Sequence, residues 1–165
     1  MASETANATK DRATFWDRLD DVNAGMLGLD EGAALVPMSH QIATESDRLY
    51  FITAEGTDLQ KAVAGGAAAA TYVLAEGGKG LYARLHGKLS QNDDPAKLEE
   101  VWNFVADAWF EGGKRDDDVR LLELRLTEGE AWVTSKSGLR FLYEVAKARI
   151  TGAEPDMGQH MKLRF

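Results

Sequence analysis

A stretch near the middle of the chain, residues 81–89, alternates strictly between two kinds of side chain. Apolar residues or glycine occupy the odd positions, namely Leu81, Ala83, Leu85, Gly87 and Leu89. Aromatic or basic residues occupy the even positions, namely Tyr82, Arg84, His86 and Lys88. Because successive side chains of a β-strand point to opposite faces, the pattern predicts a strand with one buried and one polar face. Any fold of this chain must therefore contain a half-buried sheet.

Shorter apolar segments predict further strands at 26–29, 33–38, 49–53, 69–75, 119–126 and 131–134. Glycine-containing turns predict hairpins between several of them, including a turn at Glu128-Gly129-Glu130 that joins the last two. Within 119–126 the apolar residues occur at both parities, which predicts a bulge or a strand buried on both faces.

Helical periodicity predicts helices at 9–22, 58–64, 95–109 and 139–150, the third capped by Asp94 and opened by Pro95. Hairpin-connected strands with inserted helices predict a mainly β protein, a small antiparallel β-barrel with flanking helices. No repeat or long linker occurs. We expect a single domain over residues 9–150, with tails at 1–8 and 151–165.

The composition argues against several classes of function. The net charge is −8, which argues against generic binding to nucleic acid or to an anionic membrane. The chain has no cysteine and only three histidines, so we expect no disulfide, no thiol nucleophile and no metal site. The glycine patterns of dinucleotide-binding turns and phosphate-binding P-loops are absent. Without a signal peptide or an apolar span, a cytoplasmic protein is expected.

One candidate site follows the predicted strand 49–53. Gly56, Thr57 and Asp58 form a turn and a helix start, where free N–H groups and hydroxyls favour an anion such as phosphate. Lys61 would add a positive charge. The plainer interpretation is an ordinary helix capped by Thr57.

Two other features have equally plain alternatives. Arg84, His86 and Lys88 could face a phosphate, or they could form the solvated face of a half-buried strand. A group of aromatic residues could form the wall of a flat cofactor site, or could pack in the core or at a dimer interface. These residues are Trp102, Phe104, Trp109 and Phe110.

Short motifs in a fixed order carry a resemblance to a known family. They are Phe15-Trp16, Val36-Pro37-Met38-Ser39, Leu49-Tyr50-Phe51-Ile52-Thr53, Gly56-Thr57-Asp58, the strand 81–89, the block 102–114, Leu121-Leu122-Glu123-Leu124 and Glu130-Ala131-Trp132. This order resembles the FMN-binding split-barrel proteins related to pyridoxamine 5'-phosphate oxidase, specifically the bacterial general stress protein branch. The resemblance covers about residues 15–142.

The resemblance implies a six-stranded antiparallel split barrel and a homodimer with FMN, or FAD, at two sites between the subunits. Val36-Pro37-Met38 and Phe51-Ile52-Thr53 would lie along the flavin, and Thr53, Thr57 and Lys61 would lie near its ribityl-phosphate end. Trp102 or Trp109 could come from the partner subunit.

Two positions depart from the family pattern. Val36 stands where relatives commonly carry Arg, and Asp58 and Leu59 stand where a basic residue commonly follows the position of Thr57. A missing charged contact to the phosphate would weaken binding by ~1.5–3 kcal/mol. Lys61 or Arg84 could compensate, and Asp58 next to a phosphate would be unfavourable.

The sequence supports three interpretations of function. The first is a flavin-dependent oxidoreductase with a small-molecule redox partner, whose chemistry the flavin supplies and for which no catalytic residue is assigned. The second is a stress protein that holds flavin without turnover, or haem with His40 or His86 as the iron ligand, although both histidines fit ordinary structural roles. The third is a dimeric module without a cofactor, which Val36 and Asp58 favour.

Overall fold

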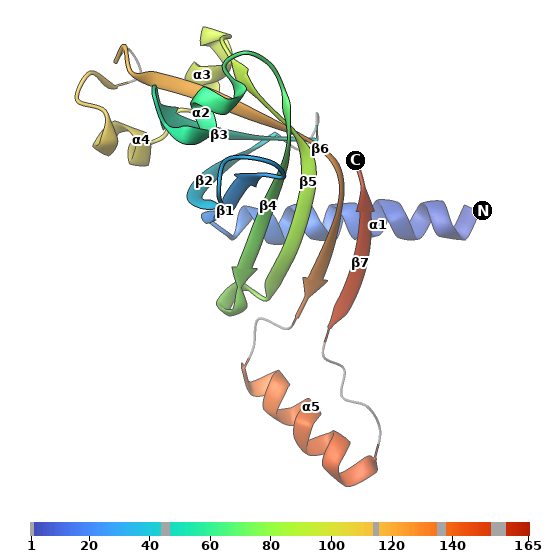
Figure 1. The fold of residues 1–165 in the computed structure, drawn as a ribbon. Coiled ribbons are helices and arrows are strands. Elements are labelled where there is room, and N and C mark those ends of the chain that lie inside the picture. The colour runs from blue at the N-terminus through green and yellow to red at the C-terminus, as the bar shows by residue number, and fades with distance from the viewer. Residues whose placement is uncertain (1, 44–46, 114–115, 135–137, 153–157) are drawn as a thin grey trace. The chain divides into compact units, whose positions relative to one another are not determined.

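The computed structural model describes residues 2–43, 47–113, 116–134, 138–152 and 158–165 (Figure 1). The strands are β1 (Ala24–Leu29), β2 (Val36–Ala43), β3 (Arg48–Ala54), β4 (Ala68–Glu76), β5 (Leu81–Asn92), β6 (Val119–Val133) and β7 (Gln159–Arg164). The helices are α1 (Ala2–Asp20), α2 (Asp58–Val63), α3 (Pro95–Val101), α4 (Phe104–Trp109), α5 (Gly138–Thr151) and the 3₁₀ turn η2 (Gly77–Lys79).

Six of the strands close into an antiparallel barrel. Hydrogen-bonded neighbours follow the order β3-β2-β1-β4-β5-β6-β7, and β3 also pairs with β6. That extra pairing is antiparallel and sets Arg48 opposite Arg125 and Ala54 opposite Val119. It joins the two ends of the six-stranded sheet and leaves β7 outside the closed barrel. The predicted six-stranded barrel with flanking helices is therefore confirmed.

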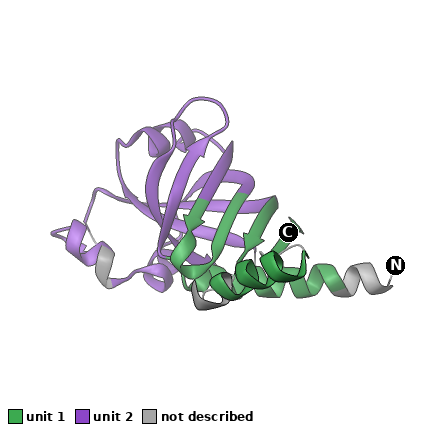
Figure 2. Cartoon of the chain, turned by 90° about the horizontal axis from the view of Figure 1, so that it is seen from below, with its two compact units in different colours: residues 1–22, 74–84, 129–164 green, residues 23–73, 85–128, 165 purple. Residues whose placement is uncertain are grey.

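The chain divides into two compact units (Figure 2). One comprises residues 1–22, 74–84 and 129–164, and the other comprises residues 23–73, 85–128 and 165. Strands β4, β5 and β6 each contribute residues to both units, so neither unit is a separate stretch of sequence. That residues 9–150 form one domain stays a prediction.

Strand β5 has the alternation that the sequence predicts. Leu81, Ala83, Leu85 and Leu89 are buried, and the basic and aromatic residues between them are exposed or half-buried. Gly87 is also buried, because the β6 backbone runs against it. A Cβ added at Gly87 would overlap the carbonyl oxygen of Arg125.

The predicted hairpin that joins strands 119–126 and 131–134 is wrong, because β6 is one strand of 15 residues. Gly129 lies buried inside it, and its neighbours Glu128 and Glu130 do not form a turn. Leu121 and Leu122 are both buried, so β6 is covered on both faces there, as one of the two alternatives predicted. Pairing along the whole length of β6 overrides the local turn preference of the glycine.

The predicted helix 95–109 is interrupted. Trp102 adopts an extended backbone that ends α3. The Asn103 side chain then accepts a hydrogen bond from the Ala106 N–H at 3.0 Å, which starts α4. An asparagine side chain that competes with the helix backbone in this way favours a new helix start over continuation.

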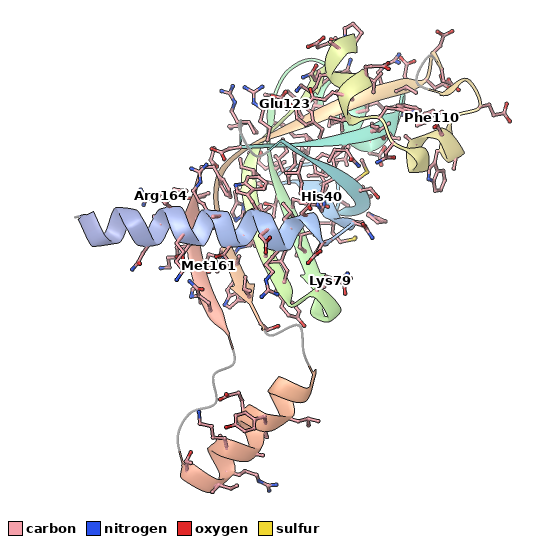
Figure 3. The ribbon with its side chains drawn as sticks, turned by 180° about the vertical axis from the view of Figure 1, so that it is seen from behind. His40, Lys79, Phe110, Glu123, Met161 and Arg164 are labelled. Carbon is pink, nitrogen blue, oxygen red and sulfur yellow. The ribbon has the colours of Figure 1, made fainter. Side chains whose placement is uncertain are left out.

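Regular secondary structure occurs within both predicted tails. α1 begins at Ala2, and β7 forms within residues 151–165. Met161 and Leu163 of β7 are buried, and α1 contacts this strand (Figure 3). Gln159 Nε2 donates to Asp11 Oδ1 at 2.6 Å, and Arg12 Nη1 donates to the carbonyl oxygen of Arg164 at 3.3 Å.

Strand β2 begins at Val36 and continues to Ala43, so Pro37 stands near its start and not near its end as predicted. A buried polar network holds this strand. The Tyr72 hydroxyl donates to the carbonyl oxygen of Met38 at 3.0 Å and lies 2.8 Å from His40 Nδ1. Because the hydroxyl has one proton and donates it to Met38, His40 Nδ1 carries the proton of the second bond. His40 is 6% exposed, so it occupies a core position.

The Tyr72 network predicts a loss of stability at alkaline pH. Burial raises the pKa of the Tyr72 hydroxyl, so above about pH 10 the unfolded chain releases this proton and the folded chain keeps it. The free energy of unfolding should fall as the pH rises from about 10, and the fall should be smaller in Tyr72→Phe. At neutral pH this variant should be about 1–3 kcal/mol less stable, because His40 and Met38 each lose a buried partner.

Urea denaturation between about pH 8 and pH 11 measures both effects, since it gives the free energy of unfolding at each pH. Tyr143→Phe, at an exposed position of α5, is the control and should keep the wild-type dependence on pH. An equal pH dependence in Tyr72→Phe and wild type would show that the buried hydroxyl does not cause it.

The close approach of β5 and β6 predicts that Gly87→Ala is destabilising. The new methyl group must push the Arg125 carbonyl away, which should lower the free energy of unfolding by about 1–3 kcal/mol. Gly65→Ala is the matched control, because nothing lies within 4 Å of a Cβ at Gly65. Urea denaturation of the two variants tests this, and equal midpoints would contradict the close approach.

Candidate functional site

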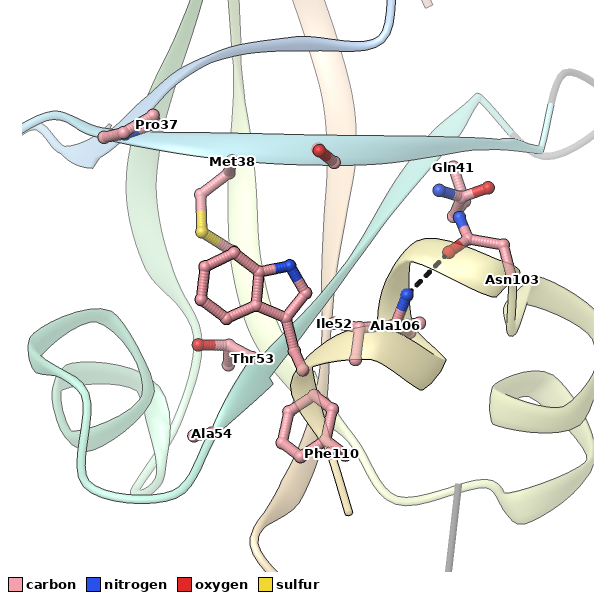
Figure 4. A pocket seen from close by; sticks show the side chains of 11 residues that line it. Pro37, Met38, Gln41, Ile52, Thr53, Ala54, Asn103, Ala106 and Phe110 are labelled. Carbon is pink, nitrogen blue, oxygen red and sulfur yellow. Dashed lines mark hydrogen bonds between the residues drawn. The ribbon is translucent and has the colours of Figure 1, made fainter. Parts of the chain in front are cut away.

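A cavity of about 340 Å³ lies in the unit formed by residues 23–73 and 85–128 (Figure 4). Its lining comes from β2, from the end of β3 and from the segment around α4. The lining residues are Pro37, Met38, Ser39, Gln41, Ile52, Thr53, Ala54, Asn103, Ala106, Trp109 and Phe110. The volume is at the lower end of the range for small-molecule sites.

The pairing of β2 with β3 brings the two strand walls together. His40 lies opposite Phe51, and both are buried in the core. Because side chains alternate along a strand, Ser39 and Gln41 point to the other face of β2 and line the cavity. The Tyr72 hydroxyl bond to the Met38 carbonyl fixes this wall from the core side.

No residue in this lining carries a formal charge. Trp109 and Phe110 supply aromatic rings, and Trp109 is 80% exposed although it borders the cavity. Figure 4 shows the Thr53 hydroxyl on one side of the cavity and the Gln41 and Asn103 amides on another. Apolar and aromatic walls with a few amides and hydroxyls suit an uncharged, flat ring system that also forms hydrogen bonds.

Five of the predicted binding residues line this cavity, namely Pro37, Met38, Ile52, Thr53 and Trp109. The others, Val36, Phe51, Thr57, Asp58, Lys61 and Trp102, lie outside the lining. Phe51 is in the core, and Trp102 donates from Nε1 to Asp107 Oδ1 at 2.7 Å. That any of these residues contacts a ligand stays a prediction.

The sequence interpretation did not select Gln41 and Asn103 as binding residues. Gln41 lies two positions after Ser39 and so on the same face of β2. The predicted strand ended at residue 38, and a prediction that extended to residue 43 would have indicated Gln41. Asn103 falls inside the predicted continuous helix 95–109, so the sequence pattern gives no signal for its place in the cavity lining. For Phe110 the sequence predicts only membership of an aromatic group.

Thr57 caps the short helix after β3, as the plainer interpretation of this turn predicted. The Thr57 hydroxyl accepts from Gln60 N at 3.4 Å as the cap of α2, and it donates to the carbonyl oxygen of Ala54 at 3.2 Å. Thr57 Oγ1 also lies 3.3 Å from Thr53 Oγ1, which links the cap to the cavity wall. Gln60 is buried and bonds to Gly56 N and Gln91, each at 2.9 Å.

An ion pair lies beside Thr53. Arg120 is directly opposite Thr53 in the β3–β6 register. Its Nη2 is 2.7 Å from Glu55 Oε2, and its Nη1 donates to the carbonyl oxygens of Asp117 and Val119 at 2.6 and 2.8 Å. The guanidinium therefore already has a carboxylate partner.

Two residues of the polar face of β5 have partners on the protein. Arg84 lies 3.5 Å from Glu130, and His86 Nδ1 lies 3.0 Å from the Thr71 hydroxyl. These contacts fit a surface role. Within the described parts of the chain, no group of three or more acidic or histidine side chains is placed to hold a metal ion. Among the helices of those same parts, none is long and apolar enough to cross a membrane.

Comparisons with known proteins agree with the fold. A crystal structure from Jannaschia sp. CCS1, described as a general stress protein 26, has 46% identity and a TM-score of 0.89, covering 96% of this chain and 99% of that one. The general stress FMN/FAD binding protein of Xanthomonas citri has 30% identity and a TM-score of 0.69, covering 78% of this chain and 92% of that one.

A general stress family protein from Xanthomonas campestris pv. campestris has 29% identity and a TM-score of 0.69, covering 78% of this chain and 90% of that one. No curated protein matches the chain. The model of the family described as "Pyridoxamine 5'-phosphate oxidase like" matches residues 10–156 of this chain. The closed barrel, the general stress relatives and this match agree, and the chain belongs to the pyridoxamine 5'-phosphate oxidase-like family.

Proposed function

We propose that this protein binds a flavin, FMN or FAD, in the cavity between β2, β3 and α4. The observation that carries the proposal is the cavity's lining of aromatic and apolar side chains with amides and hydroxyls at its edges. The FMN/FAD binding protein of Xanthomonas citri, which shares 30% identity, supports it.

The cavity residues fit the ring part of a flavin. Met38, Ile52 and the aromatic residues Trp109 and Phe110 offer surfaces for a flat ring and exclude water from it. Gln41, Asn103 and Ser39 offer donors and acceptors for its polar edge, and Thr53 offers a hydroxyl on another side of the cavity. A flavin bound there would supply the electron transfer, and these residues would position it.

We further propose that the protein works as a homodimer in the cytoplasm, with the flavin sites between the subunits. The exposed ring of Trp109 at the border of the cavity supports this arrangement, because a second subunit could cover it. Whether Trp102 or Trp109 reaches the partner's site stays a prediction.

The oxidoreductase interpretation competes with that of a protein that only holds its flavin. The described lining of the cavity offers no carboxylate, imidazole or amine, so it supplies no general acid or base. This favours positioning over proton transfer by side chains, and any turnover would depend on the flavin and a small-molecule redox partner. His40 is 6% exposed in the core, and neither His40 nor His86 is among the residues that line the cavity, so the cavity offers no histidine ligand for haem iron.

The flavin proposal predicts a spectrum. The purified protein, or apo protein titrated with FMN or FAD, should show flavin bands near ~370 and ~450 nm at about one flavin per subunit. Reduction by NADH or NADPH would then test for an enzyme. A Soret band on titration with haemin would favour haem instead, and a protein that binds none of these ligands would support the cofactor-free module.

The aromatic border of the cavity predicts the effect of Trp109→Ala. Losing the indole should weaken flavin binding about tenfold, the equivalent of about 1.4 kcal/mol of aromatic contact. Because Trp109 is 80% exposed, thermal stability should change little. Trp132→Ala is the control, since this partly exposed indole stacks on His160 and should not affect the Kd. Quenching of flavin fluorescence measures the Kd, and equal values for all three proteins would place the flavin elsewhere.

A further inference from the structure

Two charged groups beside Thr53, Arg120 and Glu55, neutralise one another. Arg120 lies directly opposite Thr53, and cross-strand neighbours have Cβ atoms about 5 Å apart on one face of the sheet. Glu55 comes two residues after Thr53, just past the end of β3, and its N–H donates to the carbonyl oxygen of Asp118 at 2.7 Å. Because its carboxylate reaches Arg120, the Glu55–Arg120 pair lies on the face of the sheet that carries Thr53.

The Arg120 guanidinium is held on that face by three protein oxygens. Glu55 Oε2 lies 2.7 Å from Nη2, and the carbonyl oxygens of Asp117 and Val119 accept from Nη1 at 2.6 and 2.8 Å. Glu55 is the only one of the three that carries a full charge. A phosphate arriving beside Thr53 would have to compete with this carboxylate for Arg120 and would be repelled by it.

In the described part of the chain, the residues that line the cavity add no positive charge of their own. The lining residues are all uncharged. Lys61 lies close to Gly56, but Asp58 precedes it in the first turn of the same short helix. Val36 contributes no charge at the start of β2.

We propose that Glu55 makes this site indifferent to the phosphate of its ligand by occupying Arg120. The site then recognises the ring system and binds riboflavin and FMN with similar affinity. This inference rests on the proposed flavin-binding function and specifies the chemical class of ligand that the site accepts.

The role of Glu55 can be separated from fold stability. Glu55 is more than half exposed, and exposed ion pairs contribute little to stability, so Glu55→Gln should fold as the wild type does. The amide keeps the shape of the side chain and removes its charge. Arg120 would then be available for a charge-assisted hydrogen bond to a phosphate.

Fluorescence titration of the purified, flavin-free protein with riboflavin and with FMN tests the proposal. In the wild type the two dissociation constants should agree within about threefold. In Glu55→Gln the affinity for FMN should rise about tenfold, with that for riboflavin unchanged. The double variant Glu55→Gln/Arg120→Gln should lose this gain.

Glu128→Gln is the matched control. It removes the same charge from an exposed position on the strand that carries Arg120, eight residues further along. A gain in FMN affinity that also appears in Glu128→Gln would reflect net charge and would overturn the role of Glu55.

The outcomes distinguish the two proposals. If the wild type binds neither riboflavin nor FMN, the proposed function fails and this inference fails with it. If the wild type binds FMN more than about thirtyfold tighter than riboflavin, the flavin site stands and the inference is wrong. An equal effect of Glu55→Gln on both ligands would likewise contradict the inference alone.

Discussion

The pairing of β3 with β6 is the interaction on which the rest of the barrel depends. It joins strands that are separated by more than 60 positions in the chain and turns an open sheet with two edges into a closed one. Leu122 lies opposite the core residue Phe51, and Leu121 packs on the other face with Tyr50 and with Val101 of α3, so both leucines are buried. The same register sets Arg120 against Thr53. One set of backbone hydrogen bonds thus determines both the fold and the charges beside the cavity.

The opposite wall of the cavity depends on a buried polar network. Tyr72 on β4 bonds to the backbone of Met38 and to the ring of His40, both on β2. Buried polar groups of this kind favour one arrangement of the core, because any shift of β2 would leave donors without acceptors. Phe51 packs edge-on against Tyr72 at 5.1 Å, so β3 contacts the same network. Tyr72 therefore contacts both β2 and β3 from the core side, and these contacts fix the two strands that line the cavity.

How far the sequence predicts this structure depends on whether a pattern is local. The alternation of β5 is a local property, and it predicted the strand correctly. Gly129 has a local preference for turns, but the pairing along β6 outweighs it, so the hairpin prediction failed. β7 is short, and the alternation of Met161 and Leu163 with polar residues is too brief to predict a strand. The strand forms because it pairs with β6 and packs against α1. In the cavity, residues on known strand motifs could be predicted, whereas Gln41 and Asn103 are brought together by the fold from segments that are distant in sequence.

The electrostatics of the chain and of the site agree. A net charge of −8 gives the protein a potential that repels anions at long range, so an anionic ligand needs local cations to overcome it. Arg120, which lies opposite Thr53, is paired with Glu55, and none of the described lining residues carries a charge. A ligand bound here gains mainly from ring contacts and from neutral hydrogen bonds. If the proposed flavin function holds, such a site would discriminate by shape and by the pattern of donors and acceptors, and not by the charge of a phosphate.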